Sequence, residues 1–189
     1  MIKIGILGEI GSGKSFIANN FGYPVFNADN EVSKLYKKDR KVFNKLRKKI
    51  PKYIISFPIL KTEISNAILC NNSNLSKIVA IVHKEVRKKL KFFLNKNKHK
   101  KIVILDIPLL LENKLNGKRD ILIFVNSKKQ DIEKRLKKRK NFNNKLVNKF
   151  KKIQLPIAYK KRKSHYIIKN NFTKKSIKKD IKDILNKIL

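Results

Sequence analysis

The chain has 189 residues, enough for one domain of ordinary size with small insertions. Its 49 Lys and Arg residues against 13 Asp and Glu residues give a formal net charge of +36, and a hydrophobic share of 41% still allows a buried core, which excludes a largely disordered chain. The single cysteine, Cys70, excludes an internal disulfide and favours a reducing compartment. No apolar run has the length of a signal peptide or membrane span. We therefore expect a cytoplasmic protein with no membrane contact.

The positive charge has two interpretations. A surplus of this size attracts nucleic acid, anionic lipid or phosphorylated metabolites. However, Lys, Asn and Ile dominate together, and A/T-rich codons specify these residues, so genome composition also accounts for the charge. Because the lysines are spread over nearly every segment, the second interpretation is favoured. Nucleic acid is then not a required partner, although the charge allows non-specific binding, and no oligomeric state is indicated.

In chain order, apolar runs predict strands over 2–7, 23–26, 102–107, 121–125 and 166–168. Apolar residues that recur at spacings of three and four, together with capping residues, predict helices. These are expected over 14–21, over 29–49 with a break near Asp39, over most of 58–94, over 127–139, over 145–153, from Pro156 and after Thr173. Ser127 and Gln130 form a capping box for the fourth of these. The alternation predicts an α/β fold with a parallel sheet covered on both faces. The helical stretch is too long for a simple crossover and predicts an inserted subdomain.

The segment between the first strand and the first helix carries the most specific motif. Residues 8–15, GEIGSGKS, match the pattern GxxxxGK[ST]. Glycines let backbone N–H groups approach phosphate oxygens, Lys14 reaches the β- and γ-phosphates, and Ser15 offers a hydroxyl to Mg²⁺. A chance glycine-rich turn explains the strand–loop–helix context less well. The sequence therefore predicts a nucleoside triphosphate site.

Other signals favour a small kinase over a GTPase. Residues 126–128, Asn-Ser-Lys, follow the fourth strand without the aspartate of a guanine-reading motif. Phosphoryl transfer needs a metal–phosphate cradle, cations over the γ-phosphate and a carboxylate near the acceptor hydroxyl. Arg135 and Arg139 lie four positions apart before a polar break, which indicates a lid that closes over ATP or, alternatively, a solvated helix face.

Three carboxylates are candidates, each with an alternative. Asp29 follows the second strand and either accepts the acceptor's proton or caps a helix. Asp106 ends the most apolar strand and either holds Mg²⁺ through water or caps the turn before Pro108. Glu112 faces either an acceptor pocket or solvent. His83 lies in an apolar helix, where a half-buried structural histidine is the usual explanation.

The order and approximate spacing of these residues resemble those of the dephospho-coenzyme A kinase family. The resemblance covers nearly the whole chain and rests on GEIGSGKS at 8–15, NAD at 27–29, VHKEV at 82–86, LDIPLLLEN at 105–113, Arg135 and Arg139, Gln154 with Lys160, and YIIKNN at 166–171. It implies a P-loop kinase core with a five-stranded parallel sheet at 1–37 and 99–189, a helical acceptor-binding insertion at 38–98 and a lid at about 139–150. It also implies an ATP-dependent phosphotransferase that acts, with Mg²⁺, on the ribose 3′-hydroxyl of dephospho-coenzyme A.

The resemblance gives each candidate residue a role. Asp29 is the expected base, and Lys14 and Arg139 stabilise the charge that develops. The expected ATP-binding residues are Gly11, Ser12, Gly13, Lys14, Ser15, Phe16, Arg135 and Asn170; those bordering the acceptor are Lys61, His83, Pro108, Leu109 and Glu112; and those near the metal are Ser15 and Asp106.

The chain departs from the family pattern at Glu9, Phe16, Asn27, Lys61, Lys84 and His165. Lys61 stands where the family usually has arginine, and Lys84 where it has the proline of an HP motif. Because lysine cannot reproduce a bidentate arginine contact, these departures are expected to affect acceptor affinity. Two other functions remain open at this point: a kinase of another nucleotide-like acceptor, and a basic P-loop protein that binds nucleic acid.

Overall fold

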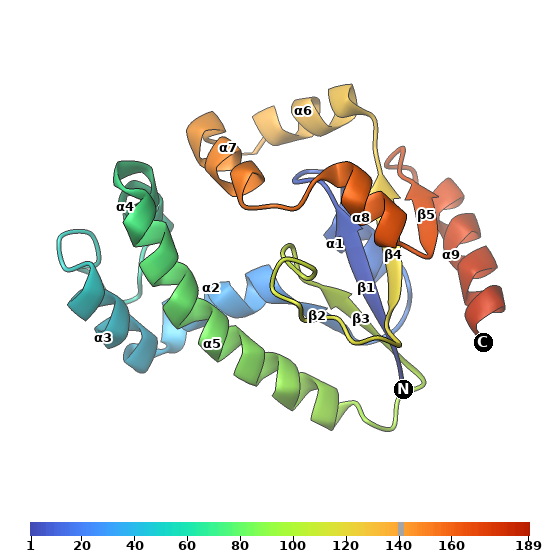
Figure 1. Ribbon diagram of the computed structural model, residues 1–189, viewed down its shortest axis with the longest axis horizontal. Coiled ribbons are helices and arrows are strands. Elements are labelled where there is room, and N and C mark those ends of the chain that lie inside the picture. Colours follow the sequence, from blue (N-terminus) through green and yellow to red (C-terminus); the bar gives the residue numbers. More distant parts are fainter. Residues whose placement is uncertain (140–141) are drawn as a thin grey trace. The chain divides into compact units, whose positions relative to one another are not determined.

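The computed structural model describes residues 1–139 and 142–189, so positions 140 and 141 of the expected lid lie outside the described residues (Figure 1). The chain divides into two compact units. The core unit comprises Met1–Asn27 and Asn97–Leu189, and the inserted unit comprises Ala28–Lys96. Among the described residues, no helix is both long enough and apolar enough to cross a membrane.

A five-stranded parallel sheet forms the centre of the core unit. Its strands are β1 (Ile2–Gly8), β2 (Val25–Asn27), β3 (Ile102–Asp106), β4 (Ile121–Asn126) and β5 (Tyr166–Lys169), in the spatial order β2-β3-β1-β4-β5. The predicted α/β fold with a five-stranded parallel sheet is thereby confirmed. Because all strands run in the same direction, the residues that follow β1, β3, β4 and β5 meet at one edge of the sheet.

Helices and one long turn cover the two faces of this sheet. On one face, α1 (Lys14–Asn19) and α9 (Lys174–Ile188) pack against alternate apolar residues of the strands, among them Ile4, Ile104 and Ile123. On the other face, α8 (Ile157–Lys163) packs against β1 and β4 (Figure 1). Leu110 packs on the same face, directly over Gly5, where a Cβ would collide with the leucine side chain.

Two shorter helices, α6 (Lys129–Lys137) and α7 (Asn144–Lys152), lie between β4 and α8 along the chain. The predicted capping box at the start of α6 is wrong. The N-cap of α6 is Lys128, and the Ser127 hydroxyl donates instead to the carbonyl of Ser12, at 2.9 Å. A tertiary hydrogen bond has therefore replaced a local cap.

The regular elements of the inserted unit are the helices α2 (Ala28–Lys38), α3 (Arg40–Lys49), α4 (Lys61–Cys70) and α5 (Asn72–Lys96), and residues 50–60 connect α3 to α4 without helix. Asp39 separates the first two helices, because its carboxylate accepts the backbone N–H of Val42 at 3.0 Å and so caps α3. This unit begins at Ala28 rather than at 38, since α2 packs against α3 and α5.

Candidate active site

The phosphate-binding loop lies between the central strand and a helix, as its motif predicts. Strand β1 ends at Gly8 and α1 begins at Lys14. Gly11 and Gly13 have φ angles of 90° and 88°, which favour glycine. A Cβ at Gly11 would lie 3.0–3.1 Å from the Leu136 and Ile132 side chains of α6. The loop therefore has both the backbone conformation and the close packing that only glycine permits.

Two side chains brace this loop through one carbonyl group. The Ser12 carbonyl accepts Asn170 Nδ2 at 2.8 Å as well as the Ser127 hydroxyl. Asn170 is buried, and its Oδ1 accepts the backbone N–H of Phe172 at 2.8 Å. Asn170 thus positions the loop from β5. The role of Ser127 was missed, although its place just after β4 put it at the loop's edge of the sheet.

The ammonium group of Lys14 lies over the loop. Its Nζ donates to the carbonyls of Glu9 at 2.7 Å and Gly8 at 3.2 Å. The first turn of α1 contains no acidic residue. The loop therefore offers a cation and backbone N–H groups at the start of a helix whose first turn carries no acidic side chain, which suits a polyphosphate. Phe16, the last of the expected ATP-binding residues of the loop, is half-buried and packs against the apolar core below the sheet.

A polar cluster beside the loop fits a magnesium ion. Asn27 and Asp106 are register partners in β2 and β3, and Asn27 Nδ2 lies 2.5 Å from Asp106 Oδ2 and 3.4 Å from Ser15 Oγ. Asp106 is only 3% exposed. Among the described residues, no three His, Cys, Asp or Glu side chains are grouped closely enough to hold a metal by themselves. Magnesium beside a nucleotide needs only one or two carboxylates, because phosphates and water supply the other oxygens.

The two candidate lid arginines lie at the end of α6. The Arg135 guanidinium lies 4.2 Å from the centre of the Phe172 ring, a cation–π distance. Helix α6 ends at Lys137, so Arg139 lies just beyond it and is exposed. These two arginines suit contacts with a nucleotide, because Arg135 presents a planar cation beside an aromatic ring and Arg139 is exposed to solvent.

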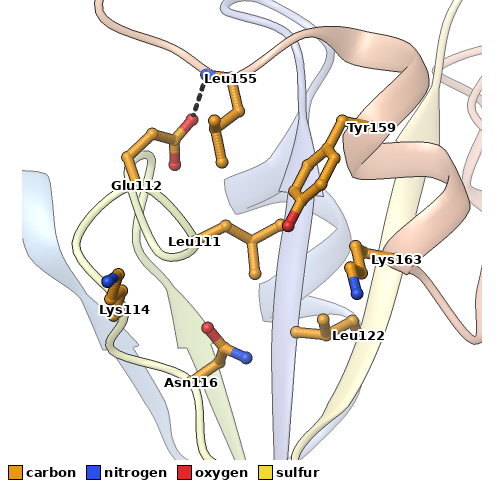
Figure 2. Close-up of a pocket in the computed structure, with 8 residues that line it drawn as sticks. All are labelled: Leu111, Glu112, Lys114, Asn116, Leu122, Leu155, Tyr159 and Lys163. Atoms are coloured by element: carbon orange, nitrogen blue, oxygen red, sulfur yellow. Dashed lines mark hydrogen bonds between the residues drawn. The ribbon is translucent and has the colours of Figure 1, made fainter.

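Glu112 is mostly buried at the edge of a pocket. It forms a 2.7 Å ion pair with Lys160, and the two side chains are 10% and 3% exposed. Glu112 also borders a pocket of about 410 Å³ between the turn after β3, the start of β4 and α8 (Figure 2). Pro108 and Leu109 are half-buried in the same turn.

The remaining expected residues lie in the inserted unit. Asp29 is exposed in the first turn of α2, inside the helix rather than at its N-cap. Lys61 is the exposed first residue of α4, and His83 is half-buried in α5. Ser127 was expected only as a helix cap and Lys160 only as part of the family pattern, and the contact between Asn27 and Asp106 was not predicted.

A glycine-rich loop between a central parallel strand and a helix, with a buried carboxylate at the end of the next strand, defines the class of P-loop kinases. A family model described as dephospho-CoA kinase matches residues 2–176. A dephospho-CoA kinase of Wolbachia pipientis wMel is 34% identical over 190 residues, covering 98% of this chain and 97% of that protein, and one of Rickettsia bellii is 30% identical, covering 98% and 96%. The chain belongs to the dephospho-CoA kinase family, and it is a kinase that transfers phosphate from ATP to an alcohol hydroxyl.

Solved structures share the fold. The Thermus thermophilus protein TT1252 superposes with a TM-score of 0.79 at 24% identity, covering 100% of this chain and 98% of that chain. A dephospho-CoA kinase from Campylobacter jejuni gives a TM-score of 0.65 at 20% identity, covering 98% and 96%. Both likenesses extend over the core and inserted units.

Proposed function

We propose that this chain phosphorylates the 3′-hydroxyl of dephospho-coenzyme A, with ATP as the donor and Mg²⁺ as the cofactor. The observation that carries the proposal is the Lys14 ammonium over a glycine loop that lies next to the cluster of Ser15, Asn27 and Asp106. Residues 11–16 bind the ATP phosphates, and Ser15 and Asp106 hold the metal. When bound, Mg²⁺ neutralises charge on the β- and γ-phosphates.

The transfer is a single displacement at phosphorus. The 3′-oxygen forms a bond to the γ-phosphorus, the bond from that phosphorus to the β–γ bridging oxygen breaks, and ADP leaves. Asp29 takes the proton of the attacking hydroxyl. Its exposed carboxylate is accessible to an acceptor, and it follows Asn27 by two residues, which span at most about 7 Å of chain. Lys14 and Arg139 stabilise the charge on the transferring group, and Arg135 and Asn170 lie on the nucleotide side.

Lys61, His83, Pro108 and Leu109 bind dephospho-coenzyme A, and Glu112 follows Pro108 and Leu109 in the turn after β3. We place the reaction in the cytoplasm, where the exposed, unpaired Cys70 thiol remains reduced.

The test is turnover of the purified chain with ATP, Mg²⁺ and dephospho-coenzyme A, followed by coupled ADP release. Asp29→Asn removes the proton acceptor, and we expect kcat to fall by about a hundredfold or more. Asp39→Asn is the matched control, since it makes the same chemical change in the same unit and asparagine caps a helix as well as aspartate does. Full turnover by Asp29→Asn would remove Asp29 as the base. Turnover only with another nucleotide-like acceptor in a parallel panel would overturn the choice of acceptor.

A further inference from the structure

The carboxylate of Glu112 joins three segments of the core unit. Its Oε1 accepts the backbone N–H of Leu155 at 2.9 Å and lies 2.7 Å from Lys160 Nζ, which also donates to Gln154 Oε1 at 3.4 Å. Glu112 belongs to the turn after β3, Leu155 to the connection between α7 and α8, and Lys160 to α8 itself. Figure 2 shows the hydrogen bond that the Leu155 backbone donates to Glu112, across the top of the pocket.

Because the ion pair of Glu112 and Lys160 is buried, its two charged groups must be closely aligned. Among the lysines whose side chains the structure describes, Lys160 is the buried one. Removing an ammonium group from water is offset only by a well-placed partner, and removing the partner leaves an uncompensated charge. Glu112 Oε2 is also buried, with no hydrogen-bond partner in the described part of the chain. The pair therefore imposes one arrangement on the segments that it joins.

The segment held in this way forms one wall of a pocket beside the phosphate loop. This pocket has a volume of about 270 Å³ and is lined by Glu9, Ile10, Lys151, Gln154, Leu155, Pro156 and Ile157. Glu9 and Ile10 come from the loop, and the carbonyl of Glu9 accepts Lys14 Nζ at 2.7 Å. Across the pocket from Glu9 and Ile10, the wall is the segment that Glu112 holds, the connection between α7 and α8. Glu112 does not line this pocket. It affects the pocket only through the connection that it holds in place.

We propose that Glu112 and Lys160 are positioning residues for phosphoryl transfer: their buried ion pair fixes the connection between α7 and α8 against the phosphate loop. The inference rests on the proposed function for the reaction that it affects. It assigns to Glu112 an indirect role in place of a direct contact with the acceptor. A displacement of about 1 Å in groups that align reacting atoms is enough to slow a reaction by an order of magnitude or more.

A second ion pair provides a matched control. Asp120 accepts the backbone N–H of Gly117 at 2.8 Å and pairs with Lys3 at 3.2 Å, so one carboxylate again holds one backbone N–H and one lysine. Asp120 is as buried as Lys160, with a side chain 3% exposed. However, it precedes β4, and Lys3 lies early in β1, so this pair lies at the opposite edge of the sheet from the phosphate loop.

The test compares Glu112→Gln, Lys160→Met and their double variant with Lys3→Met, Asp120→Asn and theirs. For each single change at Glu112 or Lys160 we expect kcat to fall by about tenfold, with the KM for ATP changed by less than about twofold. The Glu112→Gln/Lys160→Met double variant should recover part of kcat, because it leaves no unpaired buried charge. The Lys3 and Asp120 variants should lower the melting temperature but keep kcat within about twofold.

Hydrogen exchange of the peptide that contains residues 153–157, in the protein without acceptor, is the second readout. We expect faster exchange in Glu112→Gln and no change in Asp120→Asn. A normal kcat in both single variants with unchanged exchange would overturn the proposal. A raised KM for dephospho-coenzyme A in Glu112→Gln alone, with normal kcat and no recovery in the double variant, would instead make Glu112 a direct acceptor ligand. Turnover of the parent chain decides the proposed function separately, and the exchange measurement holds whichever acceptor is used.

Discussion

The side chain of Asn27 lies between the Ser15 hydroxyl and the Asp106 carboxylate, 3.4 and 2.5 Å away. Its neutral amide leaves Asp106 as the one carboxylate of this cluster. In the absence of a metal, the amide donates to Asp106 and satisfies a buried acceptor that would otherwise lose its hydration. At the proposed Mg²⁺ site, an amide at position 27 would therefore lower the affinity for the metal and raise the stability of the metal-free protein.

Asn27→Asp tests this balance. Two carboxylates at hydrogen-bond distance repel each other, so we expect the free energy of unfolding in EDTA to fall by about 1 to 3 kcal/mol. Magnesium should restore more stability to Asn27→Asp than to the parent, because ligands stabilise the state that binds them and the added charge binds Mg²⁺ more tightly. Thermal unfolding with EDTA and with increasing Mg²⁺ measures both effects.

Asn27→Ala is the control for this experiment, since it removes the hydrogen bond without adding charge. An equal response to Mg²⁺ in Asn27→Asp, Asn27→Ala and the parent would place the metal elsewhere.

A residue's role could be predicted where it depends on nearby positions in the sequence. It could not be predicted where it depends on a contact between segments that are distant in the sequence. Gly11, Gly13 and Lys14 belong to one local motif, so their spacing alone indicated the loop. Ser127 reaches the Ser12 carbonyl from 115 positions away, and its local spacing to Gln130 indicated a capping box that does not form. Lys160 was noted with Gln154 as part of the family pattern, but neither its burial nor its ion pair with Glu112 could be predicted from its neighbours in the sequence.

At the level of elements, Glu63 fixes the start of α4 to the segment before it. Its Oε1 accepts the N–H groups of Ile55 and Ser56 and the Ser56 hydroxyl, at 3.3, 3.0 and 2.7 Å, and its Oε2 accepts the N–H of Leu60 at 3.3 Å. Burial raises the pKa of Glu63, but the hydrogen bonds from Ser56, Leu60 and Ile55 together outweigh it and hold the pKa below its ordinary value of 4.5. The ionised carboxylate therefore stabilises the inserted unit.

This arrangement predicts an acid-sensitive contribution to stability. Because the folded-state pKa of Glu63 lies below the unfolded one, its contribution is complete above pH 4.5 and is lost as the pH falls through the folded-state value. Glu63→Gln should lower the free energy of unfolding at pH 7 by about 1 to 2 kcal/mol. The difference from the parent should narrow as the pH falls. Urea unfolding at a series of pH values measures this difference, with the exposed Glu133→Gln as the control.

A difference between Glu63→Gln and the parent that stays constant down to acid pH would show that the carboxylate's charge contributes nothing.

Patterns along the chain predicted which elements exist but not how they are arranged. All five strands were expected near their observed positions, because each is a short apolar run bounded by polar or turn residues. The order β2-β3-β1-β4-β5 depends on which strands pair, and nothing local encodes it. Similarly, residues 28–37 were expected in the core because the inserted stretch was set to begin at 38, but α2 packs on α3 and α5. The division of the chain into units is a property of tertiary contacts.

For the whole molecule, the dominant physical quantity is the net charge of +36. Lysines are abundant in both units, and Lys34, Lys45 and Lys88, three of those that form ion pairs, are more than half exposed, so these pairs contribute little to stability. ATP and dephospho-coenzyme A are both polyanions. A positive potential concentrates such ligands near the protein and speeds their association, which gives the charge an effect on the reaction even if genome composition is its origin.

The salt dependence of kcat/KM and of RNA binding distinguishes faster ligand association from a function in binding nucleic acid. Raising NaCl from about 50 to 300 mM at fixed free Mg²⁺ screens the field, so we expect kcat/KM for dephospho-coenzyme A to fall severalfold while kcat stays constant, because the bound complex is already formed. Binding of a fluorescent single-stranded RNA should weaken far more steeply over the same range and should not respond to ATP. Steady-state kinetics and fluorescence anisotropy on one preparation measure both, with the uncharged osmolyte sucrose as the control for solvent effects. If RNA binding instead persisted at high salt and changed with ATP, the charge would have to be assigned to a nucleic-acid partner, because a non-specific electrostatic contact is lost with screening and does not depend on the nucleotide site.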